Sequence, residues 1–181
     1  GIRNAIKGTL QAFGSDSIII LPGKESNPLL GVFGGQKFKE RDLMNLEKID
    51  GVKFFVPMDY GMVSVEYRGE KKAVLLHAAN GKNYAQVLES FQGIKLEEGQ
   101  WPIDEITSRT VLGYVATRDL FLKRVAVGDE IIIKSKRFIV SGTMSRIGEQ
   151  MVDSVVFVSM GLFRELTGTR SGSGSAFVKI E

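Results

Sequence analysis

Apolar residues recur in residues 2–13 with the spacing of an amphipathic helix. A helix of about 3.6 residues per turn places them on one face. They are Ile2, Ala5, Ile6, Leu10 and Phe13. Gly14 follows and is typical of a helix end. We therefore expect a helix over this segment, followed by a buried strand at 18–21 that Pro22-Gly23 closes.

The next part of the chain alternates between helical and extended patterns. Leu43, Leu46 and Ile49 follow helical spacing, and Gly51 marks the end of that helix. Pro57 and the residues after it predict an interruption between two strands, and a tight turn at 68–71 predicts a hairpin. The expected elements are a loop over 24–37, a helix over 38–50, strands over 52–56, 62–67 and 73–79, a turn over 59–61 and a short helix over 84–91. Their order indicates an α+β fold with a strand–helix–strand crossover.

From residue 110 the rhythm changes to short β-branched runs. Such runs are typical of a small, strongly curved sheet or part-barrel. A connector over 96–102 leads into strands over 111–116, 130–134, 137–142 and 154–158, with helical turns over 116–121 and 159–166 and a loop over 167–175. The last segment, 176–180, alternates apolar and polar residues. We expect it to return to the first sheet and bring the termini close together.

Composition places the chain among globular proteins. It has 181 residues, 43% hydrophobic and 25% charged, with a formal net charge of +3 and a mean hydropathy of +0.01. The length corresponds to one domain or two small lobes. No apolar run approaches the roughly 18 residues that span a bilayer, so we expect a soluble piece. A start at Gly1, without Met or a signal segment, indicates a fragment of a longer protein.

Few residues offer chemistry. Cysteine is absent, which excludes disulfides, thiolate metal sites and cysteine nucleophiles. The one histidine, His77, lies in an apolar run, and we interpret it as a buried sheet residue rather than a catalytic one. The glycine-rich stretch 31–36 ends on Gln36 but lacks the signature of a phosphate-binding loop, so a surface loop is favoured over a hydrolase site. We expect no metal or cofactor.

A basic turn leaves a second interpretation open. Lys134, Lys136 and Arg137 precede Phe138, as in proteins that bind nucleic acid through charge and stacking. A hairpin turn also carries such charges merely because it is solvated. Binding of nucleic acid inside the cell, through the segment from Lys134 to Arg137, is therefore the alternative function.

An ordered series of short motifs runs from residue 96 to residue 158. It reads Leu96-Glu97-Glu98-Gly99-Gln100, Val111-Leu112-Gly113-Tyr114-Val115-Ala116, Leu120-Phe121, Val127-Gly128-Asp129-Glu130-Ile131, Phe138-Ile139-Val140-Ser141-Gly142-Thr143 and Asp153-Ser154-Val155-Val156-Phe157-Val158. In this order and spacing the chain resembles the extracytoplasmic periplasmic core domain of MacB-type, FtsX-like ABC transporter permeases. Residues 14–23 agree with the start of that domain. The chain departs from the family pattern at Gln100, Thr143 and Ser159, where Arg, Val and Pro are usual.

The resemblance implies a porter-like βαβ lobe, residues 1–100 plus 172–181, interrupted by a small mostly-β lobe, residues 101–171. It assigns a structural role to the motif positions Gly99, Gly113, Phe121, Gly128, Phe138, Gly142 and Asp153. It implies no catalytic, metal or cofactor residue, and it leaves the partner-binding residues unknown.

The resemblance also implies a function. The domain is expected at the extracytoplasmic face of the cell membrane, as part of a permease. The fragment would lack the transmembrane helices of that permease. It would not be an enzyme, because ATP is hydrolysed on a separate subunit or domain. The expected partners are that ATP-binding subunit, a second permease copy, and an adaptor or substrate protein outside the membrane, with no nucleic acid. Its role would be to couple ATP hydrolysis to movement outside the membrane, in mechanotransmission, efflux or export of lipoproteins or peptides.

Overall fold

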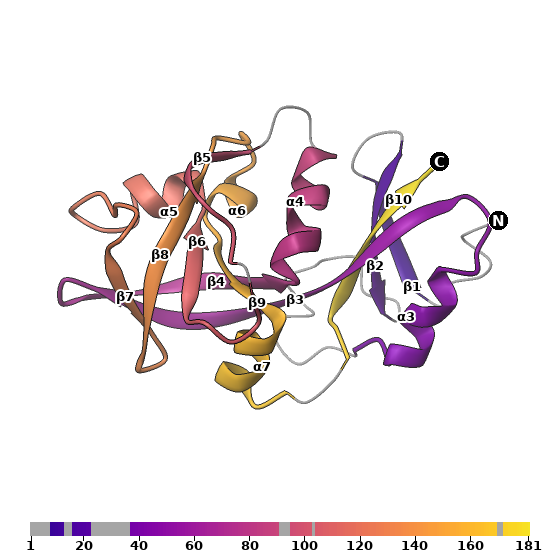
Figure 1. The fold of residues 1–181 in the computed structure, drawn as a ribbon, viewed down its shortest axis with the longest axis horizontal. Coiled ribbons are helices and arrows are strands. Elements are labelled where there is room, and N and C mark those ends of the chain that lie inside the picture. The colour runs from indigo at the N-terminus through magenta and orange to yellow at the C-terminus, as the bar shows by residue number, and fades with distance from the viewer. Residues whose placement is uncertain (1–7, 13–15, 23–36, 91–94, 103, 170–171) are drawn as a thin grey trace. The chain divides into compact units, whose positions relative to one another are not determined.

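The computed structural model describes residues 8–12, 16–22, 37–90, 95–102, 104–169 and 172–181 (Figure 1). The chain divides into two compact units. The first runs to Tyr60 and resumes at Thr169, and the second comprises Gly61–Gly168. Within the part of the chain that is described, no helix is long and apolar enough to cross a membrane.

The first unit contains a four-stranded sheet. Its strands, in order, are β1 (Gly8–Ala12), β2 (Ser17–Pro22), β10 (Ser175–Ile180) and the first half of β3 (Val52–Tyr67). β10 is antiparallel to both β2 and β3, so those two strands are parallel to each other. Helix α3 (Glu40–Leu46) connects them in sequence. The arrangement is a βαβ crossover with an antiparallel strand between its two strands.

Helix α3 covers one face of this sheet. Leu43 and Leu46 are three residues apart, so they share a helix face, and both are buried. They join a cluster of buried residues from the sheet and the segment before the helix, namely Ile18, Ile20, Phe38, Ala176 and Val178. Glu40 and Asp42 lie in the first turn, where the helix dipole favours acidic side chains. Burial of this small apolar cluster accounts for the cohesion of the first unit.

The helix expected over 2–13 is wrong where the structure describes it. Residues 8–12 form β1, which pairs antiparallel with β2 so that Leu10 lies opposite Ile20. Pairing with a β-branched strand outweighs the helical spacing of a few apolar residues, because strand propensity depends on the neighbouring strand. Residues 1–7 and 13–15, and the loop expected over 24–37 up to Gln36, lie outside the described residues.

The interruption expected at Pro57 is also absent. β3 is one strand of sixteen residues, and Pro57 lies in register with Ala176 of β10. Proline lacks only its own N–H donor, and its φ is compatible with extended backbone, so it need not end a strand. The turn expected at 59–61 is therefore wrong, and β3 supplies residues to both units.

The strands of the second unit form a closed circuit (Figure 1). The second half of β3 pairs with β4, and the circuit continues through β9, β6, β8 and β7 back to β3. The bounds are β4 (Glu70–Ala79), β5 (Leu96–Gly99), β6 (Arg109–Leu112), β7 (Glu130–Ile133), β8 (Lys136–Met144) and β9 (Val156–Ser159). β5 pairs with the far end of β8, outside the circuit. Closure leaves few exposed strand edges. The part-barrel expected from sequence is thus a small barrel.

The interior of the barrel is filled by alternate residues of its strands. Val63, Val65 and Tyr67 of β3 are buried, whereas Met62 and Ser64 are exposed. Among its described residues, this unit also has helices α4 (Gly81–Glu89), α5 (Tyr114–Arg118), α6 (Gln150–Asp153) and α7 (Met160–Thr167). The α7 residues Leu162 and Phe163 belong to the same core.

The α+β fold class is confirmed. The segment 96–102, expected as a connector, contains strand β5. The strand expected over 111–116 begins at Arg109 and ends at Leu112, where α5 takes over. The lobe boundaries near residues 100 and 171 stay a prediction. The compact units divide at residues 60 and 168, and β3 and β4 take part in the barrel.

Candidate functional site

His77 lies in an aromatic cluster on the outer side of the barrel. Only 4% of its surface is exposed, and its Nδ1 is 2.8 Å from the Tyr84 hydroxyl oxygen. The ring of Tyr84, on α4, stacks on Phe157 at 4.2 Å and meets Trp101 edge-on at 5.2 Å. Burial lowers the pKa of His77 to about 3, so the imidazole is neutral at physiological pH. As expected from sequence, His77 is a buried sheet residue.

The described residues contain no group of three or more His, Asp or Glu side chains placed to hold a metal ion. The exposed carboxylate of Asp104 forms hydrogen bonds within its own turn. It accepts hydrogen bonds from the backbone N–H groups of Ile106 and Thr107 and from the Thr107 hydroxyl. The Thr107 hydrogen bonds are the main cause that lowers the pKa of Asp104 to about 2.

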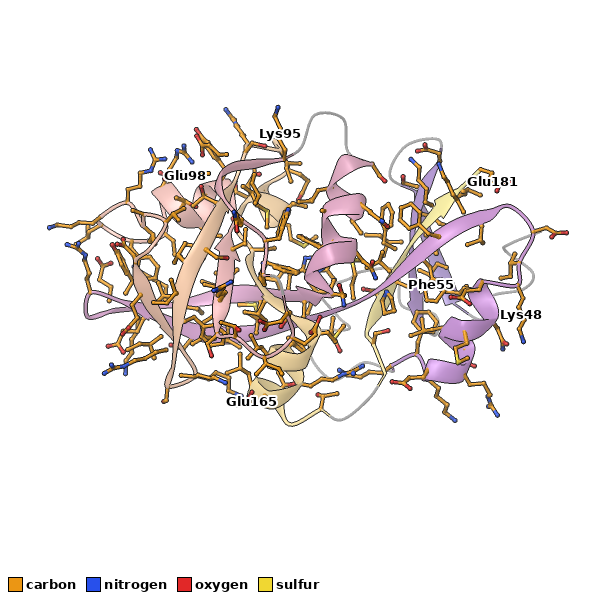
Figure 2. The ribbon with its side chains drawn as sticks, in the orientation of Figure 1. Lys48, Phe55, Lys95, Glu98, Glu165 and Glu181 are labelled. Carbon is orange, nitrogen blue, oxygen red and sulfur yellow. The ribbon has the colours of Figure 1, made fainter. Side chains whose placement is uncertain are left out.

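The basic turn between β7 and β8 is occupied by local contacts. Lys134 Nζ donates to the Leu166 carbonyl oxygen at 2.8 Å. Lys136 Nζ lies 2.8 Å from a Glu165 carboxylate oxygen; Glu165 is labelled on α7 in Figure 2. Arg137 pairs with Glu130 at 3.5 Å. Phe138 is fully buried, so it offers no face on which a base could stack. The geometry gives no support to nucleic-acid binding here.

Two of the family-motif glycines lie at one close approach between β5 and β8. A Cβ on Gly99 would lie 2.1 Å from the Ser141 carbonyl oxygen, and φ at Gly99 is +83°. A Cβ on Gly142 would lie 3.0 Å from the Gln100 carbonyl oxygen. Both positions therefore favour the absence of a side chain.

Gly113 and Asp153 form a second joint. A Cβ on Gly113 would lie 2.4 Å from the Asp153 carbonyl oxygen. The Asp153 carboxylate accepts hydrogen bonds from the backbone N–H groups of Ile147 and Gly148, both at 2.9 Å. It thereby closes the loop before α6.

The remaining motif residues are Phe121 and Phe138, in the barrel core, and Gly128, in the turn before β7. The motif residues thus lie in a turn, at points where elements approach each other closely, or in the core, and the structure does not gather them into one pocket.

Comparison with known proteins shows which family the chain belongs to. The sequence profile of the MacB-like periplasmic core domain matches residues 1–181. An uncharacterized ABC transporter permease of Methanocaldococcus jannaschii is 32% identical over 168 residues, which cover 93% of this chain and 41% of that protein. The chain belongs to the MacB-like periplasmic core domain family. It spans about two fifths of the length of this curated relative.

Solved structures agree on the fold. The periplasmic region of MacB from Actinobacillus actinomycetemcomitans superposes with a TM-score of 0.71 at 20% identity, covering 93% of this chain and 76% of that one. The extracellular domain of the noncanonic ABC-type transporter YknZ from Gram-positive bacteria gives 0.63 at 20% identity, covering 80% and 74%. These solved structures show the fold, and the family model names the domain as a MacB-like periplasmic core domain.

Sequence reasoning missed one surface of this MacB-like domain. The segment between α5 and β7 contacts the β3–β4 turn through Tyr67 and Phe121, whose rings are 5.4 Å apart. Leu122, the next residue, is almost entirely exposed. The one local signal is a leucine followed by two basic residues in a short loop.

Proposed function

We propose that this domain couples ATP hydrolysis on a separate nucleotide-binding subunit or domain to movement outside the membrane. Support comes from the family and from the fold shared with the periplasmic region of MacB and with the extracellular domain of YknZ. The domain would belong to a permease that works as a dimer at the extracytoplasmic face and acts on an adaptor or substrate protein. It would use no cofactor of its own.

The observation that carries this proposal is the pairing of strands from both ends of the chain in one sheet. β2 and β10 pair over four residue positions, from Ser17 opposite Lys179 to Ile20 opposite Ala176. Lys179 Nζ also contacts the Asp16 carboxylate. A displacement of a flanking segment therefore reaches a sheet whose hydrogen bonds act together, and it shifts the first unit as a body.

The test inserts a flexible Gly-Ser spacer after Glu181 in the full transporter, where β10 has just ended. We expect ATP turnover to persist and the transporter to fail to complement a deletion strain, because the spacer absorbs the displacement. The control places the same spacer after Ser135, an exposed position in the turn between β7 and β8. Normal complementation by the Glu181 variant would contradict the proposal.

A further inference from the structure

The loop between α5 and β7 holds one leucine almost completely in solvent. Leu122 is 93% exposed, whereas its neighbour Phe121 is 5% exposed and Val125 is fully buried. Because Phe121 and Val125 on either side are buried, Leu122 could also turn inward. The contacts around the loop explain why it does not.

Contacts on the N-terminal side of the loop fix this display. The Leu122 backbone N–H donates to a Glu70 carboxylate oxygen at 3.1 Å, and the Phe121 ring packs against Tyr67. Both Tyr67 and Glu70 border the β3–β4 turn, where Arg68 and Gly69 have positive φ. The loop is thereby attached to the tip of the hairpin.

Contacts on the C-terminal side hold the loop in the same way. The Val125 N–H donates to the Thr117 carbonyl oxygen at 3.0 Å. The Tyr67 hydroxyl donates to the Asp129 carboxylate at 2.6 Å, and that carboxylate also accepts from the Ala126 N–H at 2.9 Å. Leu122 therefore sits on a fixed loop, which lowers the entropy lost when the loop binds.

Most of the exposed charges around Leu122 are basic. Lys123 and Arg124 follow it and are exposed, and within the described part of the chain neither forms an ion pair. Arg68 is exposed on the adjoining turn. The nearby carboxylates of Glu70 and Asp129 are already hydrogen-bonded to the loop. Asp119 adds an exposed acidic side chain, so the three basic and three acidic groups balance in number. Of the six, Glu70 and Asp129 are half-buried, and the exposed charges are Arg68, Lys123 and Arg124 against Asp119 alone.

We propose that Leu122, between Arg68 and the Lys123-Arg124 pair, is the docking point for a partner protein. The partner's surface would carry an apolar pocket for the leucine, bordered by Asp and Glu side chains. Charge complementarity of this kind guides encounter, and the buried leucine supplies affinity. A fixed loop suits a shaped protein pocket better than a fluid lipid surface, which does not require one geometry. The inference rests on the proposed function in one respect, because the proposed function includes a partner protein outside the membrane.

The experiment uses the intact transporter in its host. A photoreactive benzophenone amino acid replaces Leu122, and crosslinked products are identified by mass spectrometry. The matched control places the same probe at Ile106. That residue is 83% exposed and also held by a side-chain hydrogen bond to its N–H, but it lies in an acidic turn beside Asp104 and Glu105.

We expect the probe at position 122 to crosslink one protein, at a site rich in apolar residues and bordered by acidic ones. Lys123→Glu combined with Arg124→Glu should lower that yield about tenfold. Reversal of the mapped acidic residues to Lys in the partner should restore it. The probe at position 106 should not give this product.

Three results would overturn the proposal. They are a crosslink to lipid or to a second copy of the transporter, equal products from positions 106 and 122, and a yield that charge reversal leaves unchanged. The outcome is separable from the spacer test after Glu181. If the crosslink depends on charge but the spacer variant still complements, docking at Leu122 stands and coupling fails. If the spacer variant does not complement but the crosslink is independent of charge, coupling stands and docking fails.

Discussion

At the scale of single residues, His77 shows how burial decides chemistry. Its burial among aromatic rings leaves the imidazole neutral, with a pKa of about 3. In the unfolded chain the same group titrates near 6.5. The native state therefore binds fewer protons than the unfolded state between these two values, and acid in this range favours unfolding.

We predict that the free energy of unfolding falls as the pH is lowered from about 6.5 towards 3. The contribution of His77 is about 1.4 kcal/mol per pH unit in that window. Urea unfolding at pH 7, 5.5 and 4.5 measures it. His77→Gln retains hydrogen-bonding capacity without the titration, so its stability should fall less steeply. Parallel pH profiles for the two proteins would contradict the prediction.

At the scale of elements, the passage from β6 into α5 depends on the end of α6. The Gly113 N–H donates to the Val155 carbonyl oxygen at 2.9 Å, and a Cβ at this position would lie 2.4 Å from the Asp153 carbonyl oxygen. The atoms nearest to this Cβ are backbone atoms, so no flexible side chain can move aside to make room for it. The glycine thus fixes how closely the two helices approach.

Gly113→Ala should destabilise the protein by about 2–4 kcal/mol, because the added methyl group displaces the α6 backbone. Gly61→Ala is the matched control. A Cβ there would meet only the Phe163 ring at 3.5 Å, an ordinary contact, so we expect a change within about 1 kcal/mol. Chemical denaturation of both variants measures the difference. Similar midpoints for the two variants would show that the joint is soft.

Elements with a strong local pattern were predictable from the sequence. Helices α3, α4 and α7 follow their apolar spacing, and β7 and β8 follow a clear hairpin signal. The errors fall where a distant partner decides the structure. Residues 8–12 form a strand because β2 pairs with them, and β5 forms against β8, more than forty residues later. Such pairing leaves little local signal.

The candidate docking surface was unpredictable for the same reason. Phe121, one of the motif positions, is buried. The exposure of Leu122 depends on Tyr67 and Glu70, about fifty residues earlier in the chain. By contrast, ordered short motifs were sufficient to indicate the family, since a family resemblance depends on their order and spacing rather than on contacts.

At the scale of the whole molecule, each unit has an apolar cluster of its own among the described residues. The cluster of the first unit contains Leu43 with residues of β2 and β10, and that of the second fills the barrel around Leu76. Clusters of this kind allow one unit to open while the other keeps its protection, since cooperative opening follows contiguous packing.

We predict that Leu43→Ala speeds amide hydrogen exchange in β2 and β10 and leaves β7 and β8 protected. Each buried Leu→Ala change costs about 2–5 kcal/mol locally. Leu76→Ala is the reciprocal variant and should speed exchange in the barrel strands. Mass spectrometry after proteolysis resolves the two regions. A uniform increase over the whole chain in both variants would show a single cooperative unit.

The central position of β10 has a consequence for the order in which the protein is completed. β2 and β3 each pair with β10, which comes last among the described strands. Each of them therefore lacks one of its neighbours until residues 175–180 have been synthesised. The barrel draws its residues from one continuous stretch, 61–168. A chain that emerges amino end first can therefore finish the later-encoded unit while the earlier one still waits, with two open strand edges to shield in the meantime.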